Sequence, residues 1–121
     1  MVRDRPNVVL VVLDTARYED VLTEARGRRT TPFLDELARA GTRYDSAFTP
    51  APWTLPAHAS LFTGTYPSRH GAHAGHKQLD ADLPTLAELL RDAGYETVGV
   101  SNNTWISEEF GFGREIGRAH V

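Results

Sequence analysis

The chain has 121 residues, a formal net charge of -3 at pH 7 and 40% hydrophobic residues, a composition typical of a globular protein and not of a disordered or fibrous one. The sequence contains no cysteine, which excludes a disulfide framework, a thiolate zinc site and a cysteine nucleophile. Its mild acidity and the lack of a Lys/Arg run give no sign of a nucleic-acid partner.

The first predicted element is a strand over residues 7–13, Asn7-Val-Val-Leu-Val-Val-Leu13. A short, valine-rich run that is apolar on both faces is typical of a central strand of a parallel sheet covered by helices. A buried helix is the alternative, but the shortness of the run favours a strand. The run is also too short to span a bilayer and lacks the features of a signal peptide, so we expect no membrane span and, by default, a cytoplasmic protein.

Residues 15–30 are polar and are predicted to form a loop. A helix then begins near Thr31-Pro32, because threonine caps helices and proline is favoured in the first turn, and Gly41 ends it. Imperfect alternation of apolar and polar residues predicts a second strand over residues 42–49.

The second half of the chain alternates in the same way. A proline-rich loop over residues 50–56 leads into a short helix over residues 57–62, and a long loop occupies residues 65–82. A leucine-rich helix over residues 84–93 precedes a strand over residues 95–100. Strands that alternate with helices indicate an α/β layered fold.

Two junctions in this pattern carry candidate chemistry. Asp14 directly follows the first strand, where the carboxyl ends of parallel strands form the ligand-binding edge, and its carboxylate suits a hard cation. Thr54 comes just before a predicted helix, whose first N–H groups favour anions such as sulfate or phosphate. Taken singly, Asp14 also fits a turn and Thr54 a plain helix cap.

Taken together, the segments resemble the sulfatases of the alkaline phosphatase superfamily. Residues 6–17 resemble the opening strand, and residues 31–41 resemble the helix that follows it. Thr54-Leu-Pro-Ala-His-Ala-Ser-Leu-Phe-Thr-Gly64 resembles the sulfatase signature, Cys/Ser-x-Pro-x-Arg followed by a Thr-Gly turn. Residues 83–100 resemble the next helix and strand. The resemblance implies an α/β/α sandwich with a mostly parallel central sheet, of which residues 1–115 are a truncated amino-terminal part.

The departures from the family pattern concern its charged positions. Thr54 stands where the family has a Cys or Ser that is converted to formylglycine, and His58 stands in place of the signature arginine. Thr15 replaces one of two adjacent metal-binding aspartates. The Lys and His of the family's Gly-Lys-Trp-His segment align with Asn102 and Thr104. Several charged contacts to the substrate anion are therefore replaced by neutral or weaker ones.

The resemblance also implies roles for these residues. Thr54 would be the nucleophile and, with Asp14, a ligand of a divalent cation that lowers its pKa. His58 would hydrogen-bond the developing oxyanion, although packing against the sheet is an equal alternative. Asn102 and Asn103, at a strand end, would donate hydrogen bonds to the ester oxygens. The cation would be calcium in a sulfatase-like enzyme, and zinc, manganese or magnesium in a phosphoesterase-like one.

The function expected from these residues is metal-dependent hydrolysis of sulfate esters on small molecules or glycans. Because Thr54 replaces the formylglycine precursor, phosphoester hydrolysis or phosphoryl or phosphoglycerol transfer by a threonine nucleophile is the alternative. A degenerate, non-catalytic paralogue that binds an anion or a partner protein is a further one.

The long loop contains a histidine-rich stretch with His70, His73, His76 and Lys77. We expect a solvated loop rather than a metal site, because histidines at this spacing converge only on a helix and the glycines of the stretch oppose one. Arg69 is expected to be structural, and Trp53 and Trp105 are expected to pack or to line a pocket.

The last residues, Ile116-Gly-Arg-Ala-His-Val121, can be encoded by the start of a short-read sequencing adapter, so we expect residues 116–121 to be an assembly artefact. In the family the remaining metal ligands lie far downstream. A chain without them should be inactive, and it should be poorly soluble because it exposes a strand edge and apolar helix faces.

Overall fold

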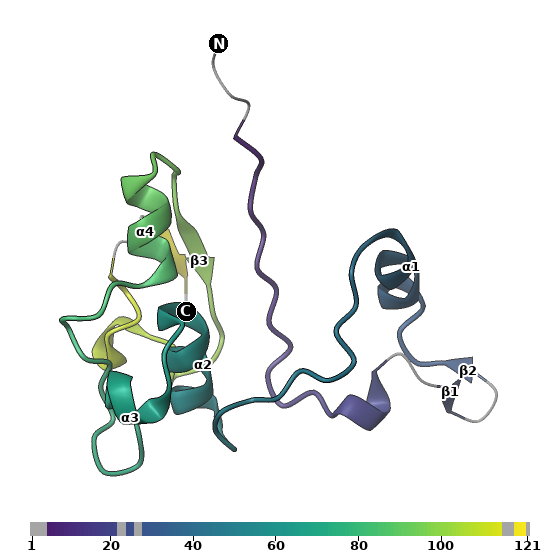
Figure 1. The fold of residues 1–121 in the computed structure, drawn as a ribbon, viewed down its shortest axis with the longest axis horizontal. Coiled ribbons are helices and arrows are strands. Elements are labelled where there is room, and N and C mark those ends of the chain that lie inside the picture. Colours follow the sequence, from purple (N-terminus) through teal and green to yellow (C-terminus); the bar gives the residue numbers. More distant parts are fainter. Residues whose placement is uncertain (1–4, 22–23, 26–27, 115–117, 121) are drawn as a thin grey trace. The chain divides into compact units, whose positions relative to one another are not determined.

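The computed structural model describes residues 5–21, 24–25, 28–114 and 118–120, with backbone alone for residues 24–25 and 118–120. The chain divides into two compact units, Met1–Ser46 and Ala47–Val121, and each is described by itself (Figure 1).

The described part of the first unit contains one α-helix. A 3₁₀ turn, η1 (Tyr18–Asp20), precedes a two-residue antiparallel pair, β1 (Glu24–Ala25) and β2 (Arg28–Arg29). Helix α1 (Pro32–Ala40) begins at a proline and ends at Gly41, as predicted. Local signals, a proline in the first turn and a terminal glycine, are sufficient to place this helix.

The two strands predicted in the first half of the chain are absent from the described residues. Residues 7–13 are extended but carry no strand assignment, and the large side chains of Val8 to Leu13 are between 42% and 83% exposed. Residues 42–49 are irregular backbone with one turn at residues 45–46, and Tyr44 and Phe48 are exposed. A strand needs the hydrogen-bonded ladder of a neighbour, and the described part of this unit pairs β1 with β2 alone. The predicted central sheet is therefore not formed by the residues that the structure describes.

The described part of the second unit contains more helix than strand. Helices α2 (Thr54–Thr63) and α3 (Pro67–His70) contact each other, and α2 also contacts α4 (Leu86–Asp92). Strand β3 (Val98–Val100) pairs in parallel with β4 (Arg118–His120), and a 3₁₀ turn, η2 (Glu108–Phe110), lies between them in sequence. The predicted strand at residues 95–100 is thus shortened to its last three residues.

Helix α2 begins three residues earlier than the sequence indicates. Trp53 is the N-cap residue, and Thr54 is already helical rather than ahead of the helix. Pro56 lies in the first turn, where a missing N–H costs nothing because those N–H groups have no intrahelical acceptor. The helix ends at Gly64, whose φ of 66° is a left-handed conformation that glycine adopts without strain.

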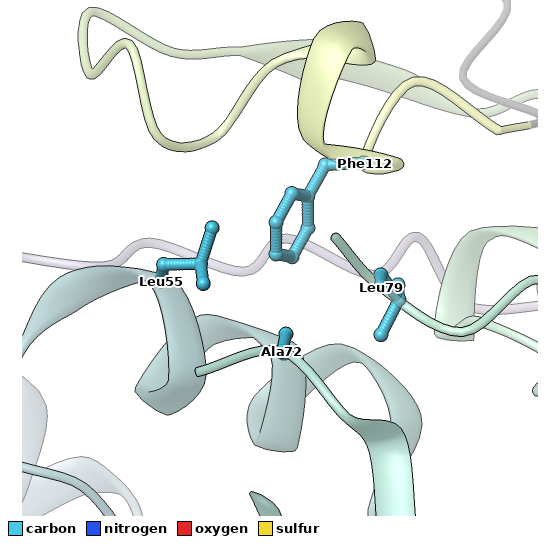
Figure 2. Close-up of a cluster of buried hydrophobic side chains, with 5 residues drawn as sticks. Leu55, Ala72, Leu79 and Phe112 are labelled. Atoms are coloured by element: carbon cyan, nitrogen blue, oxygen red, sulfur yellow. The ribbon is translucent and has the colours of Figure 1, made fainter. Parts of the chain in front are cut away.

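The core of the second unit gathers around α2. Leu55, Ala59, Ala72, Leu79 and Phe112 are buried and form one cluster. Figure 2 shows the Phe112 ring between Leu55 and Leu79, pointing toward Ala72. Burial of a Leu or Phe side chain contributes about 1.5–3 kcal/mol, so this small cluster fixes α2 against the loops that follow it.

Helix α4 is fixed at its start by a capping box. The Thr85 hydroxyl accepts from the Glu88 N–H, and the Glu88 carboxylate accepts from the Thr85 N–H at 2.6 Å. Burial alone would raise the pKa of the Glu88 carboxyl, but these hydrogen bonds and the charges of Arg114 and Arg91 lower it on balance.

Candidate functional site

Thr54, the predicted nucleophile, is the first residue of α2 and is half-buried. Trp53 before it is extended, with φ of -149° and ψ of 166°, so the chain turns sharply into the helix at this point. The N–H groups of a first helical turn lie at the positive end of the helix dipole. This position favours a tetrahedral anion beside the Thr54 hydroxyl.

His58 lies one turn further along α2 and is buried. Its Nδ1 is 2.9 Å from the Thr54 carbonyl oxygen, and because a carbonyl only accepts, Nδ1 carries the proton and donates. The neutral ring then presents a lone pair at Nε2. The predicted hydrogen bond from His58 to an oxyanion would have to come from Nε2, and Nε2 can donate only in the imidazolium form.

The loop after β3 is anchored to the start of α2 by two tryptophans. The Trp53 and Trp105 rings meet edge to face, with centroids 5.5 Å apart and an interplanar angle of 87°. Both rings pack against the buried core cluster, in agreement with the packing role expected for them. This contact joins the segment that carries Thr54 to the segment that carries the two asparagines.

Asn102 and Asn103 lie two and three residues after the end of β3, near the strand end where they were predicted. Asn102 is exposed, whereas Asn103 is half-buried and its Oδ1 accepts from the Trp105 N–H at 3.0 Å. The Asn103 N–H donates to the Ser101 hydroxyl at 3.1 Å. Asn103 therefore shapes the turn that carries Trp105, and Asn102 presents its amide to solvent.

Asp14 lies in the first unit, at an exposed turn after the extended segment. The next residue, Thr15, has a φ of 61°, which is an outlier for a β-branched residue. Strain of this kind concentrates at functional turns, which is consistent with a role for the turn. Thr54, His58, Asn102 and Asn103 all belong to the second unit.

Within the described residues, no group of three or more His, Asp or Glu side chains could hold a metal ion. Asp14, in the first unit, and Thr54, in the second, each carry a hard oxygen atom of the kind that suits calcium or magnesium. His73 and His76 face each other across an isolated antiparallel bridge. His73 Nδ1 accepts from the Gly75 N–H at 3.1 Å, so that nitrogen is already used.

His70 departs from the solvated loop predicted for it, because its side chain is fully buried. Its Nδ1 accepts from the Ala72 N–H at 3.1 Å, and its Nε2 is 2.9 Å from the Ser60 hydroxyl on α2. Burial lowers the pKa of His70, so the neutral ring is favoured. His73, His76 and Lys77 are exposed, as expected.

Sequence reasoning missed the pairing of His70 with Ser60. The available signal was the helical-turn composition of Pro67-Ser-Arg-His70 before Gly71, which places a histidine at a short helix end. Arg69, expected to be structural, is exposed in this turn.

The chain was compared with known proteins. A family model described as Sulfatase matches residues 6–121. The chain is 36% identical over 98 residues to the arylsulfatase A of Bos taurus and 34% identical over 93 residues to the uncharacterized sulfatase YidJ of Escherichia coli (strain K12). It is 30% identical over 98 residues to the N-acetylgalactosamine-6-O-sulfatase of Bacteroides thetaiotaomicron.

These alignments cover 76%, 77% and 77% of this chain and 19% of each relative. The chain therefore spans about a fifth of the length of the curated relatives it matches. No solved structure matches it. In the described part of the chain, no helix combines the length and apolar character needed to cross a membrane.

Proposed function

Because the chain belongs to the sulfatase family, we propose that the full-length protein hydrolyses sulfate esters and that Thr54 is its nucleophile. The observation that carries the proposal is the position of Thr54 at the first residue of α2, inside the segment that resembles the sulfatase signature. The names of two relatives refer to sulfated amino sugars and to ulvan. We therefore include glycan sulfates among the candidate substrates, beside small aryl sulfates.

In the proposed reaction, the Thr54 hydroxyl loses its proton and its Oγ forms a bond to sulfur. The bond from sulfur to the alcohol oxygen breaks, and the departing alcohol takes up a proton. Water then cleaves the Thr54 sulfate ester, which releases sulfate and restores the hydroxyl. The α2 dipole and the asparagine amides stabilise the negative charge on the ester oxygens in the transition state.

Asp14 and Thr54 would contribute oxygen ligands to a divalent cation, with the remaining ligands supplied by parts of the protein beyond this chain. Such a cation supplies the positive charge that lowers the pKa of a hydroxyl nucleophile. Its identity as calcium, magnesium, manganese or zinc follows from ligands that this chain does not contain.

Phosphoester hydrolysis or phosphoryl transfer is the second candidate. A threonine in place of the formylglycine precursor and a histidine in place of the signature arginine favour it. Threonine attacks phosphorus directly and needs no conversion to an aldehyde. A non-catalytic, anion-binding protein is the outcome if no ester is turned over.

The test uses the full-length protein encoded by the gene, with Thr54→Ala and the matched Thr54→Ser variant. Wild-type protein is assayed with an aryl sulfate, a phosphomonoester and a phosphodiester in the presence of each candidate cation. We expect Thr54→Ala to lower kcat/KM by roughly a thousandfold or more, and Thr54→Ser to retain activity because it keeps the hydroxyl.

The substrate preference decides between sulfate and phosphate chemistry. Full activity of Thr54→Ala would exclude Thr54 as nucleophile. Wild-type protein that turns over none of the three esters would support the non-catalytic reading.

A further inference from the structure

Lys77 is the only lysine of the sequence, and it is held above one of the two tryptophans that border the candidate site. Its Nζ lies 5.2 Å from the centroid of the Trp105 ring, within the range of a cation–π contact. Trp105 meets Trp53 edge to face, and Trp53 is the residue directly before Thr54. Two ring contacts therefore connect the ammonium group to the start of α2.

The backbone around Lys77 is fixed although its side chain is exposed. Leu79 is buried in the core, and its N–H donates to the Phe110 carbonyl at 3.1 Å. The Gln78 side chain donates to the Glu109 carbonyl at 3.3 Å. On the other side, His73 and His76 exchange both backbone hydrogen bonds. The loop thus presents Lys77 on a rigid support beside Trp105.

The charge of Lys77 is not neutralised within the described residues. Exposed arginines of the chain lie beside carboxylates, as Arg43 does with Asp45 and Arg91 with Asp92. No described carboxylate forms an ion pair with Lys77, whose interaction is with the ring of Trp105. An ammonium group over an aromatic ring retains N–H donors that point away from the ring and can bind an anion.

We propose that Lys77, carried on the Trp53–Trp105 pair, is a substrate-positioning residue that binds a second anionic group on the organic half of the ester. The proposal rests on the proposed function, with the ester at the start of α2. The two rings meet edge to face, and the ammonium lies over the face of Trp105, where its N–H groups can bind an anionic group of a ligand beside the rings. The substrate class is therefore an ester with a further sulfate or carboxylate, such as an acidic glycan.

The test measures binding separately from turnover in the full-length protein. Two non-hydrolysable sulfonates are titrated by calorimetry, benzenesulfonate and 4-carboxybenzenesulfonate, which differ by one carboxylate. We expect wild-type protein to bind the doubly charged sulfonate about fivefold to tenfold more tightly, as one partly exposed charge contact permits. Raising the salt concentration should reduce this preference.

Three variants test whether Lys77 causes the preference for the doubly charged sulfonate. Lys77→Met keeps the aliphatic stem on Trp105 but removes the charge, and it should abolish the preference. Lys77→Arg should keep it, because arginine also stacks on tryptophan. Arg91→Gln, which removes a positive charge from the exposed side of α4, should leave it intact. Circular dichroism melts check that each variant is folded.

The outcomes separate the two proposals. A wild-type protein without the preference, or a preference that survives in Lys77→Met, would overturn the role of Lys77. Equal loss in Arg91→Gln would also overturn it, because the effect would then be one of overall charge. If the preference depends on Lys77 but neither aryl sulfate with the same organic halves is hydrolysed, the binding subsite stands and the proposed hydrolysis is wrong.

Discussion

At the scale of single residues, two histidines of the second unit use their ring nitrogens in opposite ways. His58 donates from Nδ1 to the Thr54 carbonyl, inside the same helix. His70 accepts at Nδ1 from the Ala72 N–H and therefore carries its proton on Nε2, which faces the Ser60 hydroxyl. The His58 side chain is thus bonded to the start of its own helix, α2, whereas the His70 side chain holds α3 against α2.

The lowered pKa of His70 makes stability depend on pH. Burial is the main cause, opposed by a hydrogen bond from the ring to the Pro56 carbonyl. The folded-state pKa is below the ordinary value of 6.5, so the unfolded state binds more protons between the two values. The free energy of unfolding should therefore fall as the pH decreases from about 6.5 toward the folded-state pKa.

The measurement compares the full-length wild type with His70→Asn, whose Oδ1 can still accept from the Ala72 N–H but does not titrate. Denaturant unfolding between about pH 7.5 and about pH 5 should show a larger loss of stability in the wild type, by about 1.4 kcal/mol for each unit by which the pKa is lowered. His73→Asn, at an exposed position, is the control and should behave as wild type. Parallel curves for the wild type and His70→Asn would contradict the assignment.

At the scale of elements, one arginine ties the segment after η2 to the approach of α4. The Arg114 guanidinium donates to the Ala81 carbonyl at 2.8 Å and to the Leu83 carbonyl at 3.0 Å. It also lies 3.7 Å from the Glu88 carboxylate of the capping box. Its planar array of donors suits carbonyl groups in a fixed arrangement, which a lysine could not reproduce.

We expect Arg114→Met to destabilise the full-length protein by about 1–3 kcal/mol, because several buried or half-buried carbonyls lose a charged donor. The same change should raise the pKa of Glu88, since Arg114 is one of the charges that lower it. Arg114→Lys should recover part of the loss. Arg91→Met, which breaks an exposed pair with the adjacent Asp92, should cost less than about 0.5 kcal/mol. The free energy of unfolding of each variant is measured by thermal or denaturant unfolding. Equal losses of stability in Arg114→Met and Arg91→Met would refute the role of Arg114.

At the scale of the whole molecule, the chain exposes many of its large apolar side chains. Val9 and Val11 in the extended amino-terminal segment are 83% and 74% exposed, and Val100 on β3 is 81% exposed. Exposed apolar surface of this extent is typical of a face that another segment or a partner covers, and the poor solubility expected from the sequence stays a prediction. The chain spans about a fifth of its curated relatives, which leaves room for those partners.

Lysine substitutions in this segment should therefore have opposite effects in two contexts. In the 121-residue chain, Val9→Lys and Val11→Lys should raise the soluble fraction after expression, because they interrupt an exposed apolar run. In the full-length protein they should lower the melting temperature, because a central strand buries those positions. Glu19→Lys, at an exposed polar site, is the control. A full-length protein that tolerates both valine substitutions would show that residues 7–13 are not a buried strand.

Local signals in the sequence were sufficient for several features. The proline and glycine that bound α1 act within a few residues of themselves, and the leucine-rich run over residues 84–93 located α4 to within two residues. The capping box of Thr85 and Glu88 was not predicted. The family could also be recognised from the order of its segments along the chain, which the family match over residues 6–121 confirms, while the roles of Asp14, Thr54 and Asn102 stay predictions. These features depend on residues that are close together in the sequence, so they can be predicted without the tertiary structure.

The tertiary structure decided what depends on partners distant in sequence. Residues 7–13 have strand composition but no ladder in the described part of their unit, because a strand is completed by its neighbour. The sequence predicts a solvated loop position for His70, whereas the structure buries its side chain against Ser60. Lys77 is exposed as predicted, but its contact with the Trp105 ring could not be read from the sequence. Burial and side-chain pairing are properties of packed surfaces, so they follow from the folded arrangement and not from local composition.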